Sequence, residues 1–373
     1  MNNVPNNDQS STVLHCPTCD LPVTTNPCIN CGTAISDIPL EKFEQFLWDG
    51  ISQEFCKRLM IDEEWIVRED ESLTWWPSNL PQTVFVSEKI SIEPDGIPDV
   101  VTRVTVETEL GRTVDEVAVL AELVDINIDF PFGSFLLIDG MVLATFSVCF
   151  NSRNKTLIRL FCDDAIIQTT VAHEVGRRLS DKGLVELNEK PHPVSGLRTT
   201  PDEFLELYKN EDFSVMFPDH EPICRDLVRQ SLRNMYYRDG LKLGFENEEM
   251  TFFSFEKFDC GIGWRDTEPF AIRFGKGLLV WNNIAVSEEP FTDEFLNWID
   301  CVVAAPHGIG MGHIGSLTSI LRSGHYVLVL LSYLSYFVVE TTEFGIDGGA
   351  MTAMNAVHQA NASARLIAEK IHS

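Results

Sequence analysis

Residues Val114 to Phe150 read VDEVAVLAELVDINIDFPFGSFLLIDGMVLATFSVCF, and this stretch decides the fold class. Its first part, Val114 to Asn127, repeats apolar residues at the three-to-four spacing of an amphipathic helix. Phe135 to Phe150 predicts a β-hairpin, because two apolar runs flank Asp139-Gly140, a dipeptide that favours tight turns between antiparallel strands. A helix followed by an antiparallel hairpin indicates an α+β protein.

The flanking segments extend this pattern in both directions. Upstream, Leu40 to Met60 has the apolar spacing of a helix and leads into four strand-like segments. These segments are Trp65 to Val67, Leu73 to Trp76, Thr83 to Ile92 and Thr102 to Glu109. Downstream, Thr156 to Cys162 predicts a further strand, and Ile167 to Leu179 predicts a closing helix. The predicted order is helix, strands, helix, strands, helix, which we write α-βββ-α-ββ-α.

The second half of the chain repeats this order. Its predicted elements are helix Pro222 to Asp239, strands within Lys242 to Val286, helix Thr292 to Ala305, strands within Ser316 to Val339 and helix Met351 to Ile371. Three landmarks match at offsets of 178, 182 and 185 residues: Asp115-Glu116 with Asp293-Glu294, Gly133-Ser134 with Gly315-Ser316, and Val171-Ala172-His173 with Ala356-Val357-His358. Slowly drifting offsets indicate a diverged duplication with small loop insertions.

The stretch Leu120 to Cys149 resembles the YbjN-like branch of the type III secretion chaperone-like superfamily. In that family a middle helix ends near an asparagine, a Phe-Gly pair introduces a strand, and an Asp-Gly turn leads to the next strand. Asn127, Phe132-Gly133 and Asp139-Gly140 fill these places here. The resemblance implies a protein- or peptide-binding module, often dimeric, with no catalytic residues to carry over. The tandem copies could form the pair internally as a pseudo-dimer, in place of a homodimer.

Two Cys-x-x-Cys knuckles near the N-terminus predict a zinc ribbon. Cys16, Cys19, Cys28 and Cys31 would supply four thiolates in a tetrahedron, which closes the coordination shell and makes the zinc structural. A rubredoxin-like iron site and two local disulfides are the alternatives. We expect the ribbon in residues 1–38, with a disordered N-terminal tail, and chaperone-like domains in residues 39–196 and 197–373.

Tryptophans are the candidates for partner-binding grooves, with core packing as the alternative for each of them. They are Trp48, Trp65, Trp75 and Trp76 in the first copy, and Trp264, Trp281 and Trp298 in the second. The pair Trp75-Trp76 is the favoured partner contact. Consecutive strand residues face opposite sides of a sheet, so one of the two rings must lie off the main core face, under another element or in an interface.

Charge and composition narrow the class of partner. The net charge is -28, from 56 acidic and 28 basic residues, which opposes binding to nucleic acid or an anionic membrane and favours basic or amphipathic protein segments. The apolar run Tyr326 to Val339 is shorter than a membrane-spanning helix and predicts a buried strand. The sequence starts with no apolar signal segment, and the six cysteines outside the ribbon are scattered singly, so we expect a cytoplasmic protein.

Other motifs fail on their context. Gly310 to Gly315 matches G-x-G-x-x-G, but it follows a helix where the dinucleotide motif requires a strand. His307, His313 and His325 near Cys301 match no ligand spacing, and the acidic pairs Asp163-Asp164 and Glu248-Glu249 are expected in solvated turns. We therefore expect a protein- or peptide-binding module and not an enzyme. The alternatives are an enzyme with its active site between the two domains, and a scaffold that docks through the ribbon.

Overall fold

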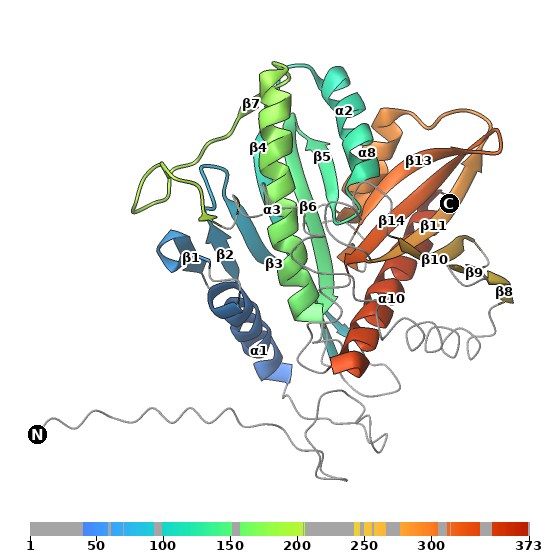
Figure 1. Cartoon of the computed structure of the whole chain (residues 1–373), viewed down its shortest axis with the longest axis horizontal. Helices are drawn as coiled ribbons and strands as arrows, with labels where there is room; N and C mark the ends of the chain where they lie inside the picture. Colours follow the sequence, from blue (N-terminus) through green and yellow to red (C-terminus); the bar gives the residue numbers. More distant parts are fainter. Residues whose placement is uncertain are drawn as a thin grey trace, which may run out of the picture.

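The computed structural model describes residues 40–58, 61–69, 71–92, 99–150, 157–203, 205, 242–246, 250–255, 257–265, 277–304, 312–313, 315–335 and 345–371. Within these residues the chain is mixed α+β, with two antiparallel sheets and helices packed on them (Figure 1). The four ribbon cysteines, the predicted helix Pro222 to Asp239 and the pair Glu248-Glu249 lie outside the described residues.

The first sheet has the strand order β1-β2-β3-β4-β6, with β5 paired to one end of β6 and β7 paired to one end of β4. Its strands are β1 (Ile66–Glu69), β2 (Ser72–Trp75), β3 (Gln82–Ile92), β4 (Asp99–Thr113), β5 (Ser134–Ile138), β6 (Met141–Phe150) and β7 (Val185–Leu187). The helical elements of this half are α1 (Leu40–Gln53), η1 (Glu54–Arg58), η2 (Glu63–Trp65), α2 (Glu116–Asp129) and α3 (Leu157–Asp181). The helices α1 and α3 lie on one face of this sheet (Figure 1).

The second sheet has the order β13-β14-β11-β10-β9-β8. Its strands are β8 (Lys242–Glu246), β9 (Met250–Ser254), β10 (Asp259–Arg265), β11 (Gly277–Ser287), β13 (Ser316–Arg322) and β14 (His325–Ser335). The helices of this half are α8 (Asp293–Ala304) and α10 (Gly345–Ile371), and α10 packs on β11 and β14. One short strand, β12 (Gly312–His313), pairs with β6 of the first sheet.

The stretch that decided the fold class forms as predicted. Asp115 caps α2 by accepting a hydrogen bond from Ala118 N–H at 3.1 Å, and the hairpin β5–β6 turns at Asp139-Gly140. Both turn residues have positive φ, 50° and 75°, which is the geometry of a type I′ turn and explains the Asp-Gly pair. The apolar run Tyr326 to Val339 is likewise a strand over its described part, in β14.

Two predictions downstream of the hairpin are wrong. Thr156 to Cys162 is not a strand, because Leu157 begins the 25-residue helix α3. Asp163-Asp164 consequently lies inside that helix, with each side chain 1% exposed, and not in a solvated turn. Burial, together with the neighbouring Asp163, raises the pKa of Asp164 well above its usual range. The first half of α3 is buried on nearly every side, so its apolar residues form an almost continuous run that does not reveal a helical period.

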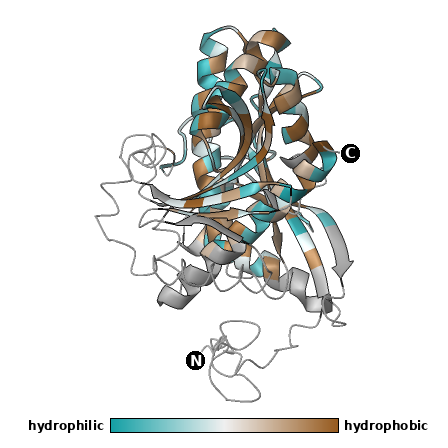
Figure 2. Ribbon diagram, turned by 90° about the vertical axis from the view of Figure 1, so that its right-hand side faces the viewer, coloured by the Kyte–Doolittle hydropathy of each residue, from teal (hydrophilic) through white to brown (hydrophobic). Residues whose placement is uncertain are grey.

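The two sheets contact each other through the helices that precede their hairpins. α2 packs against both β5 and β13, α8 packs against both β13 and β5, and the two helices touch each other. In a view turned by 90° about the vertical axis, apolar residues line the strands and the helix faces that cover them (Figure 2). The core is therefore continuous from one sheet to the other.

Candidate functional site

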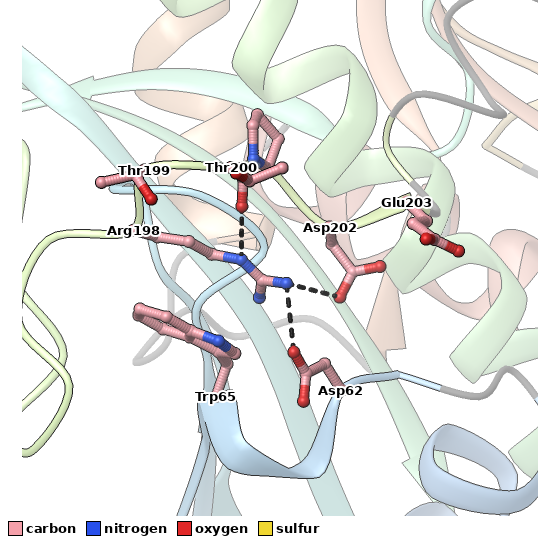
Figure 3. A pocket seen from close by; sticks show the side chains of 8 residues that line it. Asp62, Trp65, Arg198, Thr199, Thr200, Asp202 and Glu203 are labelled. Carbon is pink, nitrogen blue, oxygen red and sulfur yellow. Dashed lines mark hydrogen bonds and ion pairs between the residues drawn. The ribbon is translucent and has the colours of Figure 1, made fainter.

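A pocket of about 390 Å³ lies between η2 and residues 188–203, a segment that we call the strap (Figure 3). The strap leaves β7 and crosses the connection between β2 and β3. Lys190 N–H donates to the Asn79 carbonyl oxygen at 2.7 Å, and Asp202 N–H donates to the Pro77 carbonyl oxygen at 2.8 Å. These bonds fix both ends of the strap to the first sheet.

Arg198 anchors the strap through all three nitrogens of its guanidinium group. Nη1 donates to the Trp76 carbonyl oxygen at 2.6 Å, and Nε donates to the Thr200 carbonyl oxygen at 2.9 Å. Nη2 lies 3.4 Å from a carboxylate oxygen of Asp62 and 3.4 Å from one of Asp202. Only 7% of the Arg198 side chain is exposed. Its charge is therefore held in place by several acceptors at once, which a mobile surface arginine lacks.

Aromatic rings support this arginine from below. The Arg198 guanidinium lies 4.7 Å from the centre of the Trp65 ring, in the range of a cation–π contact. The imidazole of His192 packs against Trp65 at 5.4 Å and edge-on against Trp76 at 4.9 Å, and Trp76 Nε1–H donates to the Lys190 carbonyl oxygen. The wall of the pocket is thus rigid on the side of the sheet.

The pocket is acidic on the side that faces solvent. Asp62, Asp202 and Glu203 line it together with Arg198, and two of these carboxylates, Asp62 and Asp202, lie next to the guanidinium (Figure 3). Asp62 and Glu203 are exposed. An excess of carboxylate beside an aromatic ring favours a lysine or arginine side chain as the occupant over an anion.

The structure buries both residues of the favoured tryptophan pair. Trp75 is 1% exposed in the core, and Trp76 is 7% exposed under the strap, on the opposite side of the strand as the alternation of strand residues indicates. Neither ring is open to solvent. The tryptophan that lines the pocket is Trp65. Arg198 and Asp202 were not predicted from the sequence, because an isolated arginine in a polar stretch has no periodic signal.

The remaining described tryptophans are divided between core and surface. Trp48 packs against the core of the first half, and Trp281 lies over Gly261, where a Cβ atom would overlap its ring. Trp298 of α8 is 46% exposed. The side chain of Trp264 lies outside the described residues.

A second polar cluster joins the two sheets. Asp300 of α8, 2% exposed, accepts hydrogen bonds from Ser134 Oγ–H at 3.0 Å, from Leu317 N–H at 3.3 Å and from Asn127 Nδ2–H at 3.4 Å. Burial raises the pKa of Asp300 to about 8, although the bonds from Ser134 and Leu317 oppose that shift. The carboxylate connects the halves, and each of its described contacts is a hydrogen bond between protein groups.

The cysteine and histidines near this cluster do not form a catalytic arrangement in the described residues. Burial, and secondarily Asp300, raises the pKa of the Cys301 thiol to about 12, which suppresses the thiolate that a nucleophile requires. His313 lies in β12 and His325 is exposed at the β13–β14 turn, while His307 is outside the described residues. Gly312 pairs with Val148 of β6, so this part of the glycine-rich segment adds a strand to a sheet.

Among the described residues, no three His, Cys, Asp or Glu side chains are grouped closely enough to hold a metal ion. The same part of the chain contains no helix with the length and apolar character needed to cross a membrane. In comparisons with known proteins, no protein-family model, no curated protein and no solved structure matches this chain.

Proposed function

We propose that the chain is a protein- or peptide-binding module of chaperone-like or regulatory type. In this proposal two tandem copies of one α+β domain, residues 39–196 and 197–373, follow a structural zinc ribbon at Cys16, Cys19, Cys28 and Cys31. The observation that carries the proposal is the position of β1. It is the terminal strand of the first sheet, paired only with β2 in the described residues, and it begins at the acidic pocket.

Strand register supports the tandem copies. A row of six residues paired directly across the first sheet corresponds to a row of six across the second. These rows are Phe135, Ala144, Thr108, Gln82, Trp75 and Ile66, and Leu317, Leu330, Asn282, Cys260, Phe253 and Leu243. One position after the row, a bulge interrupts β4 between Glu109 and Gly111 and β11 between Asn283 and Ala285. Bulges are specific features of a fold, so their shared position favours common descent.

The landmark Gly133-Ser134 and its match Gly315-Ser316 also take equivalent places, at the starts of β5 and β13. The third sequence landmark is less close, because His173 is buried whereas His358 is exposed. Register is therefore better evidence for the duplication than local sequence identity.

Contacts between the copies are reciprocal, which supports an internal pseudo-dimer. His313 of the second copy pairs with Ser147 in β6, and Tyr333 N–H in β14 donates to the carbonyl oxygen of Pro131 from the first copy at 3.0 Å. Pro131 and His313 stand two positions before the matched glycines. In each copy, the segment before the hairpin therefore pairs with the edge of the other copy's sheet. An isologous interface requires this reciprocity.

The open side of β1 offers specific backbone groups. Trp76 N–H donates to the Trp65 carbonyl oxygen, so Val67 and Glu69 also direct their backbone groups toward β2. The intervening residue Arg68 directs its N–H and C=O away from β2. An extended segment of a partner protein would pair with this side and place one basic side chain in the pocket at Asp62.

Composition supports the class of partner and the compartment. The net charge of -28 attracts basic segments to the acidic pocket. None of the five cysteines of the described residues forms a disulfide, and burial raises the pKa of Cys149 and of Cys260 to about 12. Free buried thiols fit the reducing cytoplasm that we propose as the location.

A peptide-binding measurement tests the proposal. A fluorescent peptide of alternating lysine and valine is titrated against the full chain and against Arg68→Pro, which removes the outward N–H without breaking a bond between β1 and β2. We expect saturable binding to the wild type and binding at least about tenfold weaker to the Pro variant, a difference of about 1.4 kcal/mol.

Arg68→Ala is the matched control, because it removes the side chain and keeps the backbone N–H. It should bind as the wild type does, and a chain lacking residues 1–38 should too if the ribbon only stabilises the N-terminus. Equal binding by Arg68→Pro, with its melting temperature unchanged, would contradict pairing along β1. No binding by any variant to basic, neutral or acidic extended peptides would contradict the function itself.

A further inference from the structure

The two central residues of each corresponding row carry polar groups, although they lie in the cores of the two halves. They are Thr108 and Gln82 in the first sheet, and Asn282 and Cys260 in the second. In the first half, Gln168 of α3 reaches down to Thr108 and Gln82 of the sheet. Its Oε1 accepts from Gln82 Nε2–H at 2.7 Å and from Thr108 Oγ1–H at 3.1 Å, and its Nε2–H donates to the Ala144 carbonyl oxygen at 2.5 Å. All three side chains are no more than 1% exposed. Direct protein bonds thus engage the Thr108 hydroxyl and both polar atoms of Gln168, while Gln82 Oε1 is buried without a described partner.

The second half has Asn282 and Cys260 at the two positions that Thr108 and Gln82 occupy in the first. Asn361 of α10 hydrogen-bonds the Cys260 thiol, as Gln168 of α3 bonds Gln82 in the first half. Asn282 is 0% exposed, yet neither its Nδ2 nor its Oδ1 has a hydrogen-bond partner. An asparagine side chain thus replaces a threonine, and its amide is not engaged by the helix above it.

A further polar atom lies on the same face of the second sheet. Ser332 is paired with Val280, two residues from Asn282 in β11, so it stands diagonally across from Asn282 on the face that carries Leu330. Ser332 is 4% exposed, and its Oγ also lacks a partner. Three polar atoms from two side chains are therefore buried without protein bonds in one layer.

Such burial carries a large free-energy cost unless something occupies the polar atoms. An amide moved out of water without a hydrogen bond destabilises the fold, whereas a buried water with two to four polar partners removes that cost. Asn361 is one methylene shorter than Gln168, so the helix does not reach as far into this layer. Cys260 supplies only a weak thiol where the first half has the Gln82 amide.

We propose that the second half holds at least one structural water molecule between β11 and α10, bound by the Asn282 amide and the Ser332 hydroxyl. The ligand is water because the polar groups form a neutral donor and acceptor set without a cation or carboxylate among them. The site is closed to solvent, so this water exchanges only when α10 moves from the sheet. At the corresponding position of the first half the Thr108 hydroxyl already donates to Gln168 Oε1, so it is not left to a water.

Oxygen-17 magnetic relaxation dispersion on the full chain counts such long-lived waters and tests the proposal. Asn282→Leu removes the amide at nearly constant volume, and we expect it to lower the dispersion amplitude by the contribution of at least one water. Thr108→Val is the matched control at the corresponding position of the first half, and it should leave the amplitude unchanged. An amplitude in Asn282→Leu equal to that of the wild type would overturn the proposal.

A crystal structure of the wild-type chain decides the same point without a variant, in case Asn282→Leu does not fold. Electron density for a water within hydrogen-bond distance of the Asn282 amide is the expected result. Density that shows both amide atoms bonded directly to protein groups, with no water beside them, would contradict the site.

Discussion

The two sheets share strand order, register and the position of a bulge, but they complete the polar layer beneath their covering helices differently. Gln168 in α3 makes three bonds to the first sheet, whereas Asn361 in α10 contacts the Cys260 thiol and leaves Asn282 to another partner. Buried apolar residues of α3 include Leu160, Phe161 and Ile166, while those of α10 are mostly alanines. The backbone plan has been kept while the side chains that fix the helix to the sheet have changed.

The glycines that precede the two hairpins also differ in how closely the neighbouring strand approaches them. A Cβ added at Gly133 would approach the Thr145 carbonyl oxygen to 2.9 Å, while at Gly315 it would overlap the Leu331 carbonyl oxygen, and Gly315 also has φ +147°. The second copy therefore depends more strongly on its glycine.

Gly315→Ala should have the largest effect of the variants considered. The new Cβ meets backbone on the neighbouring strand and an unfavourable φ, so we expect the free energy of unfolding to fall by about 3 kcal/mol or more. Gly133→Ala, the matched variant, should cost about 1–2 kcal/mol, because a shift of a few tenths of an ångström relieves its contact. Urea denaturation of both variants checks this order, and an equal loss would show that the two sites are not as different as their geometry indicates.

Gln168→Leu should be the next most damaging, because it leaves Thr108 Oγ1 buried without its partner and removes two further buried hydrogen bonds, to Gln82 Nε2 and the Ala144 carbonyl oxygen. At roughly 1–3 kcal/mol for an orphaned group, we expect a loss of about 3 kcal/mol. Asn361→Leu loses a hydrogen bond that the amide donates to the thiol sulfur, a weak acceptor, and should cost about 1 kcal/mol. Urea midpoints compare the two, and an Asn361→Leu loss as large as that of Gln168→Leu would mean that α10 contributes more to its polar layer than the Cys260 contact shows.

The contact between the copies is asymmetric in charge, and this makes it sensitive to pH. Ser134 donates to the Asp300 carboxylate, whereas the matched Ser316 donates to the Asn127 carbonyl oxygen, which does not titrate. The pKa of Asp300 is raised in the folded chain, to about 8 from an ordinary 3.8. Its contribution to stability is therefore full below about pH 4 and is lost as the pH rises toward and through 8.

Asp300→Asn should accordingly flatten the fall in stability between pH 5 and 9. Urea midpoints at pH 5, 7 and 9 measure it, with the exposed Asp129→Asn as a control that keeps the wild-type slope. A wild-type slope in Asp300→Asn would mean that other groups carry the pH dependence.

Sequence patterns predicted the parts of this fold where one face of an element is buried. The helix Val114 to Asn127 and the hairpin at Asp139-Gly140 have clear periods and a turn dipeptide, and the structure confirms both. Thr156 to Cys162 was misassigned because the first half of α3 is buried on nearly every side, which leaves no polar face to mark a period. The order of the described elements of the second half, from β8 to α10, followed from the same signals.

The pocket could not be predicted in this way. It depends on the strap folding back more than 120 residues to bring Arg198 beside Trp76 and Asp62, and no local pattern records such a return. The Trp75-Trp76 pair did predict that one ring lies off the core, and Trp76 does so beneath the strap. The sequence could not reveal that the strap would cover that ring.

The strap runs past the predicted domain boundary at residue 196, yet it packs on the first sheet and has no counterpart in the described part of the second half. Arg198→Lys tests how much it contributes. A lysine keeps the charge but cannot bond Trp76, Thr200 and a carboxylate at once, so we expect a loss of about 1 kcal/mol and a change in tryptophan fluorescence from Trp65 and Trp76. Arg178→Lys is the control. Its ion pair with Glu122 is exposed, with 50% and 28% of the two side chains accessible, and should change stability by no more than about 0.5 kcal/mol. Equal effects of the two substitutions would indicate that Arg198 is an ordinary surface cation, and the strap would then be free to leave Trp76.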